Sequence, residues 1–201
     1  VVMGEHTDEE AIRTAAQGAD VVTFDHEHVP QDVLATLLAE GVNFQPRPSA
    51  LIFAQDKLKM RRRLQEIGAP VPPFAHLQND DDVARFWEEN NGEVIIKTAR
   101  GGYDGHGVWA PKTLAEAQEI VRTGITEHEM TMLGEWKVPW VVELSALVAQ
   151  SPEGQGAVWP VTQSIQQQGI CAVAMAPAPG LPAEVATAAQ QLGCALPRSW
   201  G

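Results

Sequence analysis

A glycine-rich stretch that directly follows an apolar run constrains this chain most. The apolar run 94–96 leads into Lys97, and four glycines fall within the seven residues 101–107. This pattern predicts a buried strand at 93–97 that opens into a loop. Glycine lets the backbone approach an anion closely and point its N–H groups at it, and a lysine adds a point charge. The sequence therefore predicts a polyphosphate site at the end of this strand.

The glycine-rich stretch differs from the common phosphate-binding motifs. Lys97 precedes the glycines, whereas the lysine of a P-loop follows them, and no Ser or Thr follows a Gly-Lys pair. Val108-Trp109 reads as a second short strand, and Asp104-Gly105 favours a turn. A plain glycine hairpin between the two strands is therefore an alternative interpretation, and the loop alone leaves both open.

Charge and composition narrow the class of partner. The chain has 201 residues and a formal net charge of −12 at pH 7, and a field of this sign repels nucleic acid and anionic membranes. No apolar run is long enough to span a bilayer, and the first residues do not resemble a signal peptide. The two cysteines lack metal-ligand spacing and are expected to be buried thiols in a reducing compartment. We therefore expect a cytoplasmic protein that acts on small molecules, without nucleic-acid or membrane partners.

Helices and strands alternate in the first third of the chain. Short strands are expected at 1–3, 21–24 and 42–44, with helices after a capping box at Thr7 and after Pro30. Strands separated by helices of this length predict a parallel sheet, and hence the α/β fold class. A doubly wound domain usually opens with a strand, a glycine turn and a helix, and this first unit is missing here.

The remainder is expected to form a separate, more strand-rich region. Residues 49–67 read as one or two helices, and Pro70, Pro72 and Pro73 form a stiff connector. The further helices expected are one opening at Asp80–Asp82, one from Thr113 to about Arg122 and one at 184–191. The further strands expected are 132–136, 140–149, 157–162 and 170–175.

Charged residues outside the loop are candidates for nucleotide contacts, although each alone also fits a surface position. Lys57 follows Asp56 at the start of a helix and could reach an α- or β-phosphate. Glu135 and Glu143 could accept hydrogen bonds from an adenine amino group or ribose hydroxyls. The basic cluster that begins at Lys57 is interpreted, for most of its members, as a solvated helix face; the others are Lys59, Arg61, Arg62 and Arg63.

The segment 25–28 has the sequence Asp-His-Glu-His, and these residue types are common metal ligands. His26 and His28 would share one face of a strand, but no third and fourth ligand is evident, so a metal site is not expected. The segment follows strand 21–24 at its carboxyl end, where α/β sheets bind ligands. Glu27 is therefore a candidate substrate contact.

These segments together resemble one known family. They are the run 21–30, Asp56-Lys57, Lys97 with the loop 101–107, Glu143-Leu144-Ser145, Trp159-Pro160-Val161, Gln168-Gly169-Ile170 and Ala176-Pro177. In this order and spacing they resemble the 5-(carboxyamino)imidazole ribonucleotide synthases of the ATP-grasp superfamily. The resemblance extends from residue 1 to about residue 193.

The resemblance implies a domain plan. An incomplete doubly wound N-terminal α/β domain with connecting helices would occupy residues 1–75. A central ATP-grasp subdomain of α+β type, with the glycine-rich loop as its lid, would occupy 76–138. An incomplete C-terminal ATP-grasp subdomain would occupy 139–201, and the chain would be truncated at both ends.

The resemblance also implies a reaction. ATP would phosphorylate bicarbonate to carboxyphosphate, which would carboxylate 5-aminoimidazole ribonucleotide in purine biosynthesis. Magnesium would be required, with its ligands beyond the C-terminus of this chain, and the full-length protein would be a homodimer. The alternatives are an inactive, truncated ATP-binding fragment, or another ATP-grasp ligase such as a biotin carboxylase.

Site residues follow from the resemblance position by position. The residues expected to contact ATP are Lys57, Lys97, Gly102, Gly105, Gly107, Glu135, Trp136, Lys137, Val138, Glu143 and Gln166. The residues expected to face the aminoimidazole ribonucleotide or bicarbonate are Glu27, Tyr103 and His106, and the catalytic loop residues would be Tyr103, Asp104 and His106. Many relatives carry arginine where this chain has His106, so a charge would be lost or become pH-dependent here.

Overall fold

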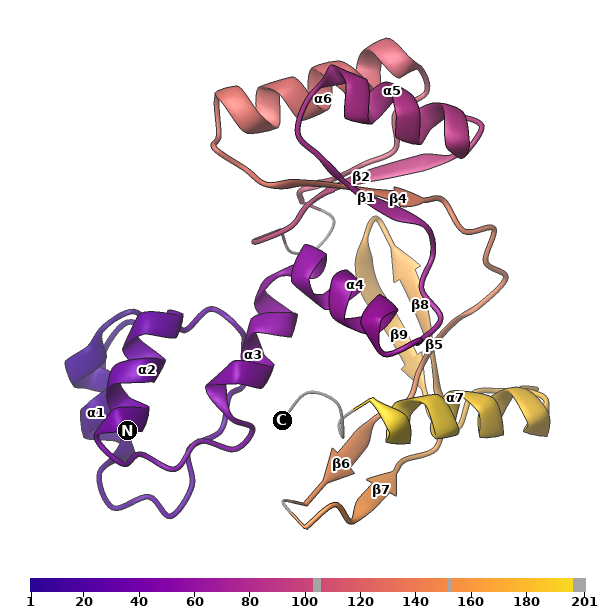
Figure 1. Ribbon diagram of the computed structural model, residues 1–201. Helices are drawn as coiled ribbons and strands as arrows, with labels where there is room; N and C mark the ends of the chain where they lie inside the picture. Colours follow the sequence, from indigo (N-terminus) through magenta and orange to yellow (C-terminus); the bar gives the residue numbers. More distant parts are fainter. Residues whose placement is uncertain (103–105, 152, 197–201) are drawn as a thin grey trace. The chain divides into compact units, whose positions relative to one another are not determined.

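The computed structural model describes residues 1–102, 106–151 and 153–196. The chain divides into two compact units, one from Val1 to Met60 and one that begins at Arg61 (Figure 1). Within the described ranges, no helix has the length and apolar character needed to cross a membrane.

The first unit is mainly helical. Its helices are α1 (Glu9–Ala16), α2 (Gln31–Ala39) and α3 (Pro48–Gln55), followed by the start of α4 (Lys57–Glu66). Leu34 and Leu37 of α2 are fully buried and pack with Phe44 and Leu51. The helix expected after Pro30 is thereby confirmed, and Leu38 on its exposed side is 47% exposed.

The strands expected in the first unit are reduced to one parallel bridge, between Val22 and Phe44. Val22 N donates to Asn43 O and Gln45 N donates to Val22 O, each at 2.9 Å, so the parallel direction is correct. The expected strand at 1–3 is wrong, since these residues have no regular structure. Apolar runs of three or four residues form strands only where neighbouring strands accept their backbone hydrogen bonds.

The first helix is capped by a different residue from the one expected. Asp8 Oδ1 accepts from Glu10 N at 3.0 Å and from Ala11 N at 3.1 Å. Thr7 is therefore not the N-cap. Aspartate and threonine cap helices in the same way, and Thr7 and Asp8 are adjacent in the sequence, so the local pattern does not distinguish between them.

A four-stranded antiparallel sheet forms the first part of the second unit. Its strands are β1 (Phe74–Leu77), β2 (Val94–Thr98), β3 (Val108–Trp109) and β4 (Met132–Trp136), in the order β1-β4-β2-β3. Helices α5 (Asp80–Glu89) and α6 (Leu114–Thr126) lie side by side over one face of this sheet (Figure 1). Asn79 and Thr113 cap the two helices through their side-chain oxygens.

Alternation along β2 separates two faces of the sheet. Val94, Ile96 and Thr98 are buried, while Ile95 and Lys97 are half-buried. Val94 and Ile96 pack against α5 and α6, with Phe86, Val121 and Met132. Because side chains alternate along a strand, Ile95 and Lys97 face away from these helices.

Replacing Gly134 with alanine should destabilise the protein by about 1–2 kcal/mol, as expected for overpacking a core. A Cβ atom there would lie 2.9 Å from Phe86 Cδ1 and 3.1 Å from Leu77 Cδ1. Urea unfolding measures the change. Gly156→Ala is the matched control, because its Cβ would meet nothing closer than Ala149 O at 3.9 Å, and equal losses in both variants would contradict the packing argument.

The rest of the second unit contains two smaller sheets and a helix. One sheet has the order β5-β8-β9, with β5 (Glu143–Ser145), β8 (Thr162–Gln167) and β9 (Ile170–Met175). The other pairs β6 (Val148–Gln150) with β7 (Gly156–Val158), and α7 (Ala183–Ala195) follows.

Two strand predictions in this part need correction. The strand expected at 140–149 is broken into β5 and β6, and the strand expected at 157–162 ends at Val158. Pro160 has no N–H to donate, so pairing stops before it and resumes in β8. The expectation of buried cysteines is also wrong: Cys171 is exposed and Cys194 is half-buried.

Candidate functional site

Lys97 and Glu135 lie on the face of the sheet that turns away from α5 and α6. The β2–β4 register pairs Ile95 with Glu135 and Lys97 with Leu133. Residues diagonally opposite on one face of an antiparallel pair are close enough for long side chains to meet. Lys97 Nζ indeed donates to Glu135 Oε2. Two residues expected to contact ATP are therefore direct partners.

Arg61 of α4 completes this arrangement. Its Nε donates to Glu135 Oε1 at 2.5 Å. The Glu135 side chain is only 5% exposed, while those of Arg61 and Lys97 are 21% and 25% exposed. Glu135 is thus a buried carboxylate held between two cations, and the interpretation of it as a surface strand residue is wrong.

The charge state of Glu135 follows from these contacts. Burial alone would raise its pKa, but the hydrogen bond and charge of Lys97, together with Arg61, outweigh burial and lower the pKa of Glu135 below its ordinary value. The three side chains therefore carry a net charge of about +1 at neutral pH. A cluster with a net positive charge beside a glycine-rich loop suits an anionic ligand.

Gly102 and Gly107, near the two ends of the glycine-rich loop, both lie close to Thr98. Thr98 N donates to Gly107 O at 2.9 Å. Gly102 and Gly107 have φ angles of +80° and +73°. A Cβ on Gly102 would lie 2.7 Å from His106 O, and one on Gly107 would lie 2.7 Å from Thr98 Oγ1. Both positions therefore require glycine.

Part of the predicted loop lies outside the described residues, namely Tyr103, Asp104 and Gly105. His106 is exposed where the description resumes. The pairing of β2 with β3, with Ile96 opposite Trp109, shows that the loop connects the two strands of a hairpin. The hairpin interpretation of this stretch is therefore correct, and a loop of this kind is compatible with ligand binding.

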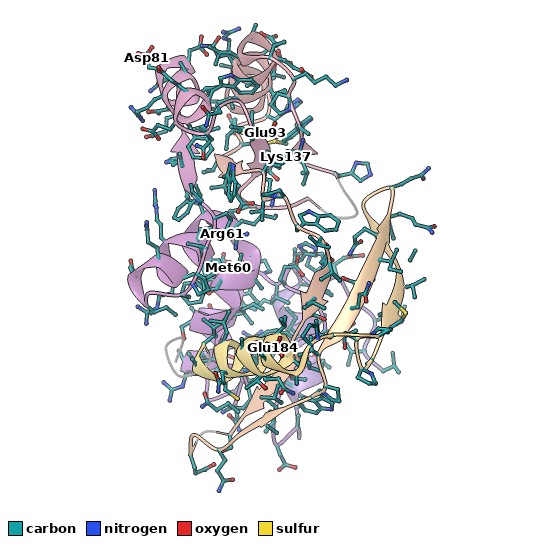
Figure 2. All side chains as sticks on the ribbon, turned by 90° about the vertical axis from the view of Figure 1, so that its right-hand side faces the viewer. Met60, Arg61, Asp81, Glu93, Lys137 and Glu184 are labelled. Atoms are coloured by element: carbon teal, nitrogen blue, oxygen red, sulfur yellow. The ribbon has the colours of Figure 1, made fainter. Side chains whose placement is uncertain are left out.

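The segment after β4 offers backbone groups to a ligand. Trp136 N and Lys137 N donate to Pro73 O and Glu93 O, each at 2.9 Å, so these two amides are already used. Within the described part of the chain, the amide of Val138 has no hydrogen-bond partner. Lys137 Nζ lies 3.6 Å from Glu93 Oε2, an exposed pair that Figure 2 shows side by side. Of the segment expected to contact adenine, Val138 therefore has the available donor.

Glu143 and Gln166 are brought together by the pairing of β5 with β8. Glu143 lies opposite Ser164, and Gln166 lies two residues further along the same face. Ser164 Oγ and Gln166 Nε2 donate to Glu143 Oε1 at 2.7 Å and 2.6 Å. These two hydrogen bonds, that of Ser164 first, lower the pKa of Glu143. The result is an oriented, exposed carboxylate whose Oε2 receives no hydrogen bond from the residues that the structure describes and can accept from hydroxyl donors.

In the first unit, Gln55 holds the segment that carries Glu27. Gln55 is buried, and its Nε2 donates to Glu27 O at 2.6 Å and to Val29 O at 2.7 Å. Gln31 Nε2 donates in turn to Gln55 Oε1 at 3.0 Å. The half-buried Glu27 thus lies in a turn whose backbone carbonyl groups are held by Gln55 of α3.

Gln55→Leu should destabilise the protein by about 2 kcal/mol, because the variant leaves two carbonyl oxygens of this turn without their donor. Urea unfolding at neutral pH measures this loss. Gln65→Leu on α4 is the control, since Gln65 is exposed. A loss no greater than that of the control would show that the Gln55 hydrogen bonds contribute nothing net.

The histidines of segment 25–28 are arranged differently from the expectation. The segment is a bend rather than a strand, and His28 N donates to His26 Nδ1 at 3.1 Å. The ring centroids of His26 and His28 are 5.4 Å apart, and that of His6 lies 5.3 Å from His26. Across the described ranges, no group of three or more His, Cys, Asp or Glu side chains is placed to hold a metal ion.

Asp56 and Lys57 begin α4. Asp56 is buried, and its Oδ1 accepts from Lys59 N at 3.0 Å, which caps the helix. Lys57 is half-buried in the first turn. The expected position of Lys57 at a helix start is therefore correct.

Three residues contribute to these arrangements without a role predicted from the sequence: Arg61, Ser164 and Gln55. For Arg61 a signal existed, because it lies three residues from both Leu58 and Leu64, which are 5% and 9% exposed. That spacing places Arg61 on the buried face of α4. The interpretation of the basic cluster as a solvated face is made for most of its members, and Arg61 is an exception to it.

Comparison with known proteins agrees with these features. A family model described as the ATP-grasp domain matches residues 62–199, and one described as the ribonucleotide synthetase preATP-grasp domain matches residues 1–55. The N5-carboxyaminoimidazole ribonucleotide synthase of Corynebacterium ammoniagenes is 47% identical over 193 residues, 96% of this chain and 46% of that protein. The synthase of Mycobacterium tuberculosis is 48% identical over 196 residues. The chain thus spans about half the length of the curated relatives it matches.

A solved structure of a related protein has a similar fold. The N5-carboxyaminoimidazole ribonucleotide synthetase of Thermus thermophilus superposes with a TM-score of 0.86 at 26% identity, over 99% of this chain and 52% of that one. These matches confirm the resemblance found in the sequence, and the ATP-grasp model alone covers well over half of the residues. The chain belongs to the ATP-grasp family.

Proposed function

We propose that this chain forms the ATP-binding part of a ligase that carboxylates 5-aminoimidazole ribonucleotide with ATP and bicarbonate. The observation that carries the proposal is the 47% identity to an N5-carboxyaminoimidazole ribonucleotide synthase over 96% of the chain. The positive cluster of Lys97, Arg61 and Glu135 beside the glycine-rich loop supports it. A solved synthase of similar fold, that of Aspergillus clavatus, is described as complexed with ATP.

The site residues take roles that suit phosphoryl transfer, which depends on positioning and charge neutralisation. Lys57 and Lys97 bind phosphate oxygens, and the backbone from Gly102 to Gly107, including Gly105, covers the transferring phosphate. The adenine edge lies against 135–138. Glu143, oriented by Gln166, accepts from the ribose hydroxyls. Each role is a proposal for the intact protein.

The second substrate is expected near Glu27, Tyr103 and His106. Aminoimidazole ribonucleotide carries amino and hydroxyl donors, and a carboxylate such as Glu27 accepts from both. Tyr103, Asp104 and His106 belong to the loop that would close over the reacting groups. Closure has a clear purpose, because carboxyphosphate hydrolyses in water.

Magnesium is part of the proposal only for a longer protein. The described residues offer no group of three or more metal-binding side chains, so we derive no step of the reaction from the metal. The domain plan of 1–75, 76–138 and 139–201, a homodimer, a cytoplasmic location and the absence of nucleic-acid or membrane partners likewise belong to the proposal.

The first experiment tests ATP binding by this chain alone. We expect weak ATP binding by calorimetry and negligible release of ADP, because phosphoryl transfer without bound magnesium lacks its main source of charge neutralisation. Absence of any ATP binding would contradict the nucleotide site. Release of ADP that depends on aminoimidazole ribonucleotide, at the rate of a complete enzyme, would contradict the inactive-fragment alternative.

The second experiment separates the proposed reaction from that of a biotin carboxylase. The intact protein is incubated with ATP and bicarbonate, together with aminoimidazole ribonucleotide or biotin. We expect only aminoimidazole ribonucleotide to stimulate ADP release. Stimulation by biotin instead would replace the proposed substrate.

A further inference from the structure

The buried carboxylate of Glu135 has a separate cation on each oxygen. Arg61 Nε binds Oε1 at 2.5 Å, and Lys97 Nζ binds Oε2. The two cations come from different elements, α4 and β2. One of them can therefore leave the carboxylate without disturbing the hydrogen bond of the other.

The two cations differ in their freedom to leave. Arg61 lies on the same face of α4 as Leu58 and Leu64, which are both buried. Its guanidinium is planar and presents its donors in a rigid fork that matches a carboxylate. Lys97 instead lies on β2, one residue before Thr98, whose amide binds the end of the glycine-rich loop. Its flexible four-carbon stem carries three rotatable donors.

A buried carboxylate that loses its only partner is strongly disfavoured. If Lys97 were the only cation on Glu135, binding a phosphate would require it to leave an unpaired buried charge. With Arg61 on the other oxygen, the carboxylate keeps one partner throughout. The arrangement therefore lowers the cost of moving Lys97.

We propose that Arg61 is a positioning residue of the nucleotide site, which holds Glu135 ionised and paired while Lys97 turns from this carboxylate to a nucleoside triphosphate. The ligand in this statement rests on the proposed function. The role of Arg61 toward Glu135 does not, and the two parts can be tested separately.

The first test needs no nucleotide. The Lys97→Met variant imitates the departure of Lys97, and the carboxyl carbon of Glu135 is followed by ¹³C NMR during a pH titration. We expect the pKa of Glu135 to stay below its ordinary value in this variant and to rise above it in Arg61→Met/Lys97→Met. Arg61→Lys/Lys97→Met, which keeps the charge, should restore the low pKa. Identical titration with and without Arg61 would overturn the proposal.

The second test measures ATP affinity by calorimetry, in the native background and in Glu135→Gln. Arg61→Met should weaken ATP binding about tenfold in the native background, because Lys97 is then the one cation paired with Glu135 among the described residues. In the Glu135→Gln background the same substitution should change the affinity less than about twofold, since no buried charge competes for Lys97. Equal losses in both backgrounds would mean that Arg61 itself contacts the nucleotide, and no loss in the native background would mean that it has no role; either result overturns the proposal.

Arg62→Met is the matched control, because Arg62 is exposed on the same helix. It should leave both the Glu135 titration and the ATP affinity unchanged. If the native chain bound no ATP at all, the proposed function would fail, while the titration would still decide whether Arg61 holds Glu135. If the double variant did not fold, the affinity measurements would decide instead.

Discussion

Replacing Lys97 with methionine should weaken ATP binding by about 1.5–3 kcal/mol, the usual contribution of a charge-assisted hydrogen bond. Lys97 is the lysine at the end of β2, immediately before the residue that anchors the glycine-rich loop. The substitution keeps an unbranched apolar chain about as long as the four-carbon stem of lysine, and it removes the ammonium group with its charge and donors. Calorimetric titration with ATP measures the loss.

The Lys97 prediction is specific for the phosphate groups. Adenosine should bind the Lys97→Met variant and the native chain with similar affinity, because adenosine carries no phosphate. Lys112→Met is the control for a general loss of positive charge, since Lys112 is exposed before α6. An unchanged affinity for ATP in Lys97→Met would remove this residue from the site.

Glu135→Gln should lower the free energy of unfolding at neutral pH by about 3 kcal/mol, as expected when one charge of a buried ion pair is removed. Arg61 and Lys97 would then face a neutral amide, although both remain partly exposed. Urea unfolding of the native chain and the variant gives the difference.

The effect of Glu135→Gln should depend on pH. The folded-state pKa of Glu135 lies below its ordinary value of 4.5. The ionised carboxylate therefore stabilises the folded state above that value, and this contribution is lost as the pH falls through the lowered pKa. The gap in stability between native chain and variant should accordingly narrow in acid. A gap that stayed constant down to the acid limit of folding would show that Glu135 is not held ionised by its partners.

Glu143→Gln provides the comparison for Glu135. The pKa of Glu143 is also lowered, but by hydrogen bonds from Ser164 and Gln166 on an exposed strand. Solvent screens such a group, so the variant should change stability by less than about 0.5 kcal/mol. An effect as large as that of Glu135→Gln would show that exposure does not separate the two carboxylates.

Elements with a strong local sequence pattern could be predicted from the sequence alone. The apolar run before Lys97 forms most of β2, and the helix expected after Pro30 is α2, which buries Leu34 and Leu37. The glycines at 102 and 107 were recognised as a close-approach loop, and their positive φ angles fit that prediction. Each of these features is determined by neighbours in sequence.

Features that depend on distant partners could not be predicted in the same way. β8 contains three glutamines, one serine and one threonine among its six residues, and it is a strand because β5 and β9 pair with it on both sides. The burial of Glu135 depends on Arg61, which lies 74 residues earlier in the chain. Gln55 looked like an ordinary helix residue, and its role depends on two carbonyl groups of a turn more than 20 residues away. Pairings of this kind are set by tertiary contacts rather than by local propensity.

The edge strand β9 has a consequence for handling this polypeptide. Its sequence, Ile-Cys-Ala-Val-Ala-Met, carries no charge, and its first five residues are exposed. Uncharged edge strands are templates on which a strand of another molecule can add, which leads to aggregation. The exposed Cys171 within this strand would covalently fix such contacts under oxidising conditions. Dilute samples with a thiol reductant are therefore the appropriate form for spectroscopy and calorimetry.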